Sequence, residues 1–429
     1  MSHTNTNTDK IKASLKKRYA REKRFRFYGF ASIAISFLFL LILLLNISLK
    51  GYPAFQQTYV QLDINIKAET LGVDKNSKSD ALFSADYNVL VINALKETFP
   101  NVKGRKQKRA LKNLVSNSAA YDLRDAVVAN PNLIGTTQSF WFLAKDDVDV
   151  YMKGNIDRNS PEADRRVKDF QLVWIDKLQQ EGRLEKRFNT NFFSFGDSRE
   201  PEQAGIKGAI VGSLLTMLVT LLLSFPIGVG AAVYLEEFAP KNNRWVDMIE
   251  ININNLAAVP SIVFGLLGLA VFISFFGVPR SAPLVGGLVL TLMTLPTIII
   301  ASRAAIKSVP PSIREAAYGL GASRVQTTFH HTIPLAMPGI LTGTIIGMAQ
   351  ALGETAPLLM IGMVAFVADI PQSITDPSTV LPIQIFLWSD SPERAFTERA
   401  SAAIMVLIGF LVVMNLLAVF LRKKFEKKW

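Results

Sequence analysis

Long apolar runs without charged residues fill most of the C-terminal half of the chain and occur once near its N-terminus. Six windows contain no Asp, Glu, Lys or Arg over at least 22 positions: Phe27–Leu49, Gly208–Leu235, Ile251–Pro279, Ser281–Ser302, Thr332–Gly353 and Ala400–Leu421. A helix needs about 20 apolar residues to cross the hydrocarbon core of a bilayer. The pattern therefore predicts an all-α polytopic membrane protein with six transmembrane helices.

The basic residues flank these runs, so the net charge of +12 indicates how the chain is oriented in the membrane. Nine Lys and Arg residues lie between Lys10 and Arg26, and five lie between Arg422 and Lys428. Positively charged flanks stay in the cytoplasm, and six crossings return the C-terminus to the same side. We expect both termini to be cytoplasmic and the lipid bilayer, not nucleic acid, to be the partner of this charge.

The domain organisation follows from these crossings. Residues 1–26 are a basic cytoplasmic tail, and residues 27–49 are an anchor helix. The apolar run of the anchor is longer than that of a signal peptide, and no small-residue cleavage site follows it, so we expect it to stay uncleaved. Residues 50–206 form a periplasmic domain, and residues 207–429 form the transmembrane domain. The acidic stretch 197–202 is the predicted boundary between the two.

The periplasmic segment is long enough to bury a core of its own. Residues 60–66 alternate between apolar and polar positions, which predicts a strand. Residues 90–95 and 167–178 have helical spacing, and Gly182 closes the second helix. We expect an α+β or mainly helical domain inserted after the first transmembrane helix. Its basic stretch 103–112 is suited to attract an anion or a binding protein, or is a solvated face; we favour the solvated face.

A polar interval, residues 308–334, interrupts the apolar half and lies in the cytoplasm by the six-span count. Ser312 and Glu315 are spaced as a capping box, and Ser323 and Gln326 repeat that spacing. Gly321 is predicted to end the first helix in a left-handed conformation. The residues at apolar helical spacing are Ile313, Ala316, Ala317 and Leu320. A helix with such small side chains is suited to dock into the groove of a partner.

Three interruptions of the apolar windows are candidates for a transport pathway. Pro260 removes a backbone donor inside a span, and Ser261 follows it. Arg303 stands at the cytoplasmic end of another span, where it meets an anion or simply marks orientation. Glu354 is the single charge between Thr332 and Ala368. Either it lies within the membrane, or the helix ends near it and a re-entrant piece follows. The candidate pathway residues are Pro260, Ser261, Arg303, Gln350, Glu354 and Thr355.

The chain lacks the residues that several kinds of catalysis require. It has no cysteine, no phosphate-binding loop of the Gly-x-x-x-x-Gly-Lys-Ser/Thr type and no His-Glu-x-x-His motif. Its three histidines are His3, His330 and His331, and they do not form a metal-binding set. We expect no catalytic residues, no metal and no cofactor. If the protein performs work, another subunit supplies the energy.

The cytoplasmic interval resembles the EAA loop of ABC-importer permeases. The resemblance rests on Glu315-Ala316-Ala317, on Gly321 six residues after the glutamate, and on Ile333-Pro334. His331 stands where the family pattern has its first isoleucine, and Ile333 stands where it has leucine. The resemblance implies that this loop is a coupling helix resting on a cytoplasmic ATPase. Glu315, Ala316, Ala317 and Gly321 would then be the residues that couple the two proteins.

Three phrases extend the resemblance to the A-type permease subunits of phosphate ABC importers over about residues 205–429. They are NLAAVPSIVFGLLGLAVF at 255–272, LGETAPLL at 352–359 and LPIQIFLW at 381–388. The N-terminal half resembles the extended external segment of a subset of these subunits. The resemblance implies a type I importer permease fold in a bacterial inner membrane. It also implies a C-type permease as partner, two ATP-binding subunits and a periplasmic phosphate-binding protein.

One departure from the family concerns the charge that attracts the anion. Many relatives carry arginine where this chain has Gln350. The positive charge must then come from Arg303, from the partner permease or from helix N-termini. Two other functions stay open. A sulfate or molybdate permease would share the EAA loop but not the GETAPLL phrase. A membrane-anchored sensor would need a cytoplasmic output domain, and the cytoplasmic segments are too short for one.

Overall fold

The computed structural model describes residues 5–240, 242–364 and 366–425. His3, Lys427 and Lys428 lie outside the described residues. Contacts divide the chain into two compact units, residues 1–50 and 51–429. The described residues of the first unit belong to a single helix, α1 (Asn5–Gly51), which contains the predicted anchor 27–49. The second unit contains the segment 51–206 together with the other apolar helices.

The described residues contain five helices that are long and apolar enough to cross a membrane, or six if one bent pair counts as a span. The five are Lys17–Phe55, Lys207–Phe238, Pro283–Lys307, Arg324–Gly353 and Arg394–Lys424. The bent pair joins α11 (Arg244–Ala257) to the segment Ser261–Phe275 at an angle of 105°. The six apolar windows are therefore recovered, but the window 251–279 is not one continuous helix. Pro260 caps the second piece because it cannot continue the first.

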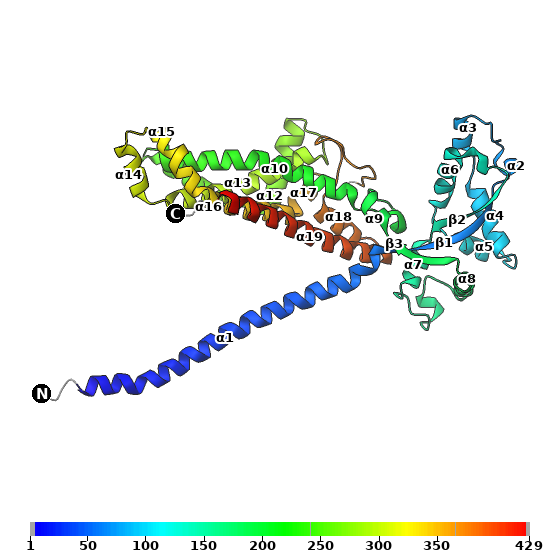
Figure 1. Cartoon of the computed structure of the whole chain (residues 1–429), viewed down its shortest axis with the longest axis horizontal. Helices are drawn as coiled ribbons and strands as arrows, with labels where there is room; N and C mark the ends of the chain where they lie inside the picture. The colour runs from blue at the N-terminus through cyan, green and yellow to red at the C-terminus, as the bar shows by residue number, and fades with distance from the viewer. Residues whose placement is uncertain (1–4, 241, 365, 426–429) are drawn as a thin grey trace. The chain divides into compact units, whose positions relative to one another are not determined.

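Four long helices run side by side in the transmembrane part of Figure 1. They are α10 (Lys207–Val233), α13 (Pro283–Lys307), α16 (Ile333–Gly353) and α19 (Arg394–Phe425). α13 and α16 are antiparallel and pack closely, because a Cβ atom on Gly343 would lie 2.2 Å from the Cβ atom of Ala301. Without a hydrophobic driving force between helices in lipid, such close backbone approach supplies the packing energy.

Shorter elements connect these helices. The π-helical turn η5 (Tyr234–Phe238) continues α10, and α12 (Ser261–Leu267) runs into the π-helical η6 (Gly268–Phe275). The polar interval 308–334 forms α14 (Pro311–Gly319), α15 (Arg324–Thr327) and the π-helical η7 (Thr328–Thr332). α17 (Ala356–Met360) and α18 (Leu381–Ser389) lie between α16 and α19.

The segment 51–206 is an α+β fold built on an antiparallel sheet of order β2-β1-β3. The strands are β1 (Gln56–Asn65), β2 (Thr137–Leu143) and β3 (Leu184–Phe188). The predicted alternation is confirmed, since Val60, Leu62, Ile64 and Ile66 are all fully buried. The α-helices of this segment are α2 (Ala68–Leu71), α3 (Ser79–Ser84), α4 (Asn88–Thr98), α5 (Arg105–Lys112), α6 (Ala119–Ala129), α7 (Asp146–Met152), α8 (Asp169–Gln180) and α9 (Thr190–Ser194). Its single 3-10 turns are η1 (Tyr52–Phe55), η2 (Pro131–Leu133), η3 (Glu162–Asp164) and η4 (Pro201–Gln203).

Two of the predicted helices and the basic stretch are found where the sequence placed them. α4 contains residues 90–95, and α8 ends before Gly182, which adopts a φ of +70°. The basic stretch forms α5, and its Lys and Arg side chains are exposed. This exposure agrees with the solvated-face interpretation.

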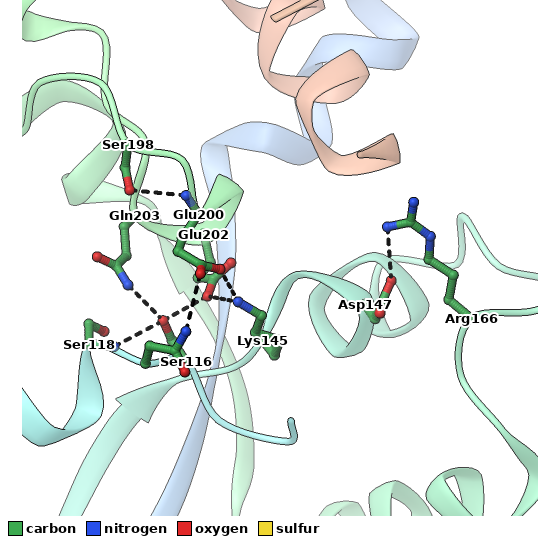
Figure 2. A network of polar contacts seen from close by, with 10 residues as sticks. Ser116, Ser118, Lys145, Asp147, Arg166, Ser198, Glu200, Glu202 and Gln203 are labelled. Atoms are coloured by element: carbon green, nitrogen blue, oxygen red, sulfur yellow. Dashed lines mark hydrogen bonds and ion pairs between the residues drawn. The ribbon is translucent and has the colours of Figure 1, made fainter. Parts of the chain in front are cut away.

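The acidic stretch 197–202 is a packed junction. Figure 2 shows Lys145, which donates to both Glu200 and Glu202. The Ser116 hydroxyl donates to Glu202 at 2.7 Å, and Gln203 donates to Ser116 at 3.1 Å. Glu202 is only 1 % exposed. These bonds connect the α+β fold to the residues just before α10.

A second set of buried charges joins the α+β fold to α19. Lys153 pairs with Asp149 of α7 at 2.7 Å and with Glu398 of α19 at 2.7 Å. Arg399 donates to the carbonyl of Ala204 at 2.6 Å and to Gln57 at 3.0 Å. These contacts explain why residues 51–429 form one compact unit.

The junction is expected to gain stability in acid. Burial raises the pKa of Glu202 above its usual 4.5, although Lys145 opposes the shift. An acid with a raised pKa binds its proton more tightly in the folded state than in the unfolded state. Its contribution to the free energy of unfolding is therefore full below pH 4.5 and is lost as the pH rises through the folded pKa. We expect Glu202→Gln to reduce the gain in melting temperature of the purified protein between pH 7.5 and pH 5. The exposed Glu69→Gln variant is the control, and equal gains in both variants would contradict the assignment.

Candidate coupling and transport sites

In the polar interval 308–334, the first helix ends where its glycine predicts, and the second capping box is present. α14 ends at Gly319, Leu320 is its C-cap, and Gly321 follows with a φ of +84°. The predicted second capping box is confirmed. The Ser323 amide donates to the Gln326 side chain at 2.9 Å, and the Gln326 amide donates to the Ser323 hydroxyl at 3.2 Å.

One other prediction about this loop is wrong. α14 begins at Pro311 with Pro310 as its N-cap, so Ser312 and Glu315 do not form a capping box. The residues at apolar helical spacing differ in their exposure. Ala317 is buried, whereas Ala316 is exposed and Leu320 is 90 % exposed. Arg314 instead points back toward the bundle, where hydrogen bonds compensate the burial of its charge.

The loop exposes several large apolar side chains at one place in the sequence. They are Tyr318, Leu320, Val325 and Phe329, which we call the loop patch. Glu315 and Ala316 of the EAA motif are exposed on the same helix. Exposed apolar residues with polar neighbours are typical of protein–protein contact sites. The loop patch is therefore a candidate docking surface.

Arg303 is neutralised by carboxylates inside the chain. Its Nε atom lies 2.5 Å from Glu236 of η5, and one Nη atom lies 2.6 Å from Glu250 of α11. Lys307 also reaches Glu236, at 3.3 Å. With Arg314 and its partner Glu237, three positive and three negative side chains face one another. This balance disfavours Arg303 as the source of positive charge for an anion.

Arg314 connects α14 to the bundle at several points. Its Nε and Nη2 atoms lie 3.1 and 2.7 Å from the same Glu237 oxygen. Nη2 also donates to the carbonyl of Ile306, and Nη1 donates to that of Val309. The sequence reasoning missed this pair and the partners of Arg303. The adjacent carboxylates of Glu236 and Glu237 after an apolar window were the available signal.

The two broken apolar segments lie side by side, although about 95 residues separate them. Pro260 and Ser261 begin α12, and α12 packs against α17. The backbones of the two helices approach closely at Gly265, because a Cβ atom there would lie 2.6 Å from the carbonyl oxygen of Pro357. The structure therefore brings together the phrases 255–272 and 352–359.

α16 ends at Gly353, and Glu354 is its C-cap, so the helix does not continue past the carboxylate. Of the two predicted alternatives, the structure has the helix that ends near Glu354. The register that pairs Gly339 with Ala305 and Gly343 with Ala301 places Glu354 level with Leu290. At a rise of 1.5 Å per residue, that level lies about 10 Å from the outer end of α13.

One face of α16 is left uncovered by the described part of the chain. Ile346 and Gln350 are exposed and lie one turn apart, and Glu354, one further turn along, is half-buried. Thr355 follows and is also half-buried. In a transmembrane helix such a face borders lipid or another subunit. The polar side chains of Gln350 and Glu354 favour another subunit, because polar groups in lipid are costly.

A cavity of about 500 Å³ lies between α10, α16 and α19. Its walls are apolar side chains apart from Thr344 and Asn415. A dehydrated anion needs several donors and positive charge around it, and this cavity offers only those two polar side chains and no positive charge. The cavity is therefore not a candidate anion site.

The contact between α12 and α17 gives a direct test of the site. Gly265→Ala would push a methyl group into the backbone of Pro357, which cannot move aside as a flexible side chain would. Overpacking of this kind costs about 1–3 kcal/mol. We expect a lower melting temperature in detergent and a loss of transport. Gly230→Ala in α10 is the matched control, because nothing lies within 4 Å of that position. Equal behaviour of the two variants would contradict the packing argument.

Two family models match the chain. One, described as a binding-protein-dependent transport system inner membrane component, matches residues 224–429. The other, described as a domain of unknown function (DUF3333), matches residues 12–162. The chain is 32 % identical over 237 residues to a probable ABC transporter permease protein YqgI of Bacillus subtilis, covering 52 % of this chain and 80 % of the relative. This chain belongs to the family of ABC transporter permeases, and it is a permease subunit rather than an enzyme.

Further relatives have more specific names. The chain is 33 % identical over 225 residues to a phosphate transport system permease protein PstA 1 of Mycobacterium tuberculosis, covering 52 % of this chain and 72 % of the relative. It is 31 % identical over 223 residues to PstA of Yersinia pestis, covering 51 % of this chain and 74 % of the relative. An inward-facing methionine ABC transporter, MetNI, matches with a TM-score of 0.44 and 15 % identity, covering 52 % of this chain and 96 % of that chain.

Proposed function

We propose that this chain is a transmembrane permease subunit of an ATP-driven phosphate importer in a bacterial inner membrane. It forms half of the translocation pathway, and a C-type permease forms the other half. Two ATP-binding subunits lie on the cytoplasmic side, and a periplasmic phosphate-binding protein delivers the anion. The observation that carries the choice of phosphate is the similarity to PstA permeases over the membrane half of the chain.

The loop patch is the proposed contact with the ATP-binding subunit. Glu315, Ala316, Ala317 and Gly321 position it, since they form and end α14. The exposure of Leu320 supports this role, because a leucine that remains in water on a membrane protein's polar loop is suited to a partner's groove. ATP-driven closure of the two ATP-binding subunits would move α14, and the spans on either side would follow.

The proposed pathway runs along the uncovered face of α16. Gln350, Glu354 and Thr355 lie on that side, and the start of α12 at Pro260 and Ser261 packs nearby through α17. Since Glu236 and Glu250 neutralise Arg303, the positive charge that attracts phosphate comes from the partner permease. Broken helices at such positions are common in transporters, where backbone lines the pathway.

The orientation of the chain follows from the same proposal. Both termini and residue 323 lie in the cytoplasm, and the β1–β3 fold lies in the periplasm. A reporter enzyme that is active only outside the cytoplasm is expected to work when fused within residues 60–200. The same reporter fused at Ser323 is expected to be inactive, and activity there would contradict the orientation.

Transport by the reconstituted complex tests the substrate. Vesicles carrying both permeases and the ATP-binding subunits are supplied with the periplasmic binding protein, ATP and labelled phosphate. We expect ATP-dependent accumulation of phosphate that excess sulfate or molybdate does not inhibit. Uptake of sulfate or molybdate with none of phosphate would instead identify the permease of another oxyanion importer.

A further inference from the structure

Two adjacent carboxylates at the cytoplasmic end of α10 hold arginines of two different elements. Glu236 binds Arg303 at the end of α13, and Glu237 binds Arg314 of the coupling helix α14. Both carboxylates lie in η5, where the chain is π-helical. Such turns are rare and occur frequently at functional sites. This short turn therefore connects three helices.

The Arg314–Glu237 pair is buried and geometrically defined. The side chains of Glu237 and Arg314 are 6 % and 20 % exposed, and their closest atoms lie 2.7 Å apart. The remaining donors of Arg314 bond the carbonyls of Ile306 and Val309, at the end of α13 and just beyond it. A forked guanidinium with several acceptors keeps one orientation, unlike a contact between apolar surfaces, which can slide.

The other contacts of α14, and those of the neighbouring α15, hold the loop against the bundle less firmly. Ala317 is buried but small, and Ile313 is half-buried. Arg324 of α15 lies over the ring of Phe238, with 5.7 Å between the guanidinium carbon and the ring centroid. A cation–π contact at that distance contributes little compared with a buried ion pair. The ion pair is therefore the stiffest connection between α14 and α10.

We propose that Arg314 and Glu237 are positioning residues that transmit the displacement of α14 to α10. The Glu236–Arg303 pair joins α10 to α13, so both helices follow the movement. This inference rests on the proposed function of the loop patch as the contact with the ATP-binding subunit. It adds the route by which movement at that contact reaches the transmembrane helices.

The test compares transport with ATP hydrolysis in the complete reconstituted complex. In Arg314→Gln we expect the number of phosphate ions transported per ATP to fall about tenfold or more, while the ATP-binding subunits still co-purify. Lys307→Gln is the matched control. It removes a cation from the same group of charges, but Lys307 pairs with Glu236 and has no ion pair to α14. We expect its ratio to stay at the wild-type value.

A crosslink distinguishes a transmitting link from a merely structural one. The chain has no cysteine, so Arg314→Cys combined with Glu237→Cys introduces its two thiols. We expect this double variant to be uncoupled and a short bifunctional thiol reagent to restore the transport ratio. Each single-cysteine variant, treated with the same reagent, should stay uncoupled.

Two outcomes overturn the proposal: a wild-type ratio in Arg314→Gln, or a crosslinked double variant that stays uncoupled. A failure of the proposed function would be seen in the wild-type complex. The wild-type complex would then show no phosphate-dependent ATP hydrolysis or would lack bound ATP-binding subunits.

Discussion

Replacing Glu354 by Gln is expected to reduce phosphate uptake about a hundredfold while the ATP-binding subunits remain bound. Glu354 ends α16 about 10 Å inside the outer end of α13 and lies on the face that the rest of the described chain leaves uncovered. A carboxylate repels phosphate, and low dielectric strengthens that repulsion. We therefore propose an indirect role, in which Glu354 holds a cation of the partner permease. Removing one member of a buried pair costs roughly 3–5 kcal/mol.

The measurement is uptake of labelled phosphate by vesicles that contain equal amounts of wild-type and variant complex. Asp390→Asn is the matched control, because Asp390 is an exposed carboxylate after α18, away from the uncovered face of α16. We expect normal uptake in the control. Near-normal uptake in Glu354→Gln would show that this carboxylate stands in water, and it would end the pathway assignment.

Replacing Leu320 by Asp is expected to abolish association with the ATP-binding subunit. Leu320 is 90 % exposed and follows the last residue of α14, next to the left-handed Gly321. Apolar anchors at the centre of an interface commonly contribute 2 kcal/mol or more, and a buried unpaired charge adds a desolvation cost. Together these effects exceed about a hundredfold in affinity. Co-purification of the ATP-binding subunit with the permease measures the result.

The folded chain itself is expected to tolerate the change, because Leu320 contributes little to its own packing. Val173→Asp in α8 is the matched control, since Val173 is also an exposed apolar residue but belongs to the periplasmic fold. We expect Val173→Asp to retain the ATP-binding subunit. Full retention by Leu320→Asp would place the docking surface elsewhere on the loop.

Several features of this protein follow from local patterns, and the sequence alone determined them. The six charge-free windows predict the membrane helices because crossing the hydrocarbon requires length and apolarity, whatever the neighbours are. Alternation over residues 60–66 predicts β1 because the period of two belongs to the strand itself. Gly321 ends α14 as predicted because a left-handed residue at that position favours glycine.

The tertiary structure decided which polar side chains find partners. Arg303 is suited by its position to meet an anion, yet Glu236 and Glu250 reach it from other elements. Arg314 lies outside the set of residues at apolar spacing, yet Glu237 and two backbone carbonyls compensate its burial. Ala317 and Leu320 share that spacing, yet Ala317 is buried and Leu320 is exposed. Helical periodicity identifies a face but does not identify the charges that lie opposite it.

The same reason applies to the contact between α12 and α17. Pro260 and Pro357 each predict a local break in a helix, because proline lacks the amide donor. The 105° bend, and the packing of Gly265 on the backbone of Pro357, depend on how the two broken segments meet. That meeting is a long-range contact between segments about 95 residues apart, so spacing within either segment contains no information about it.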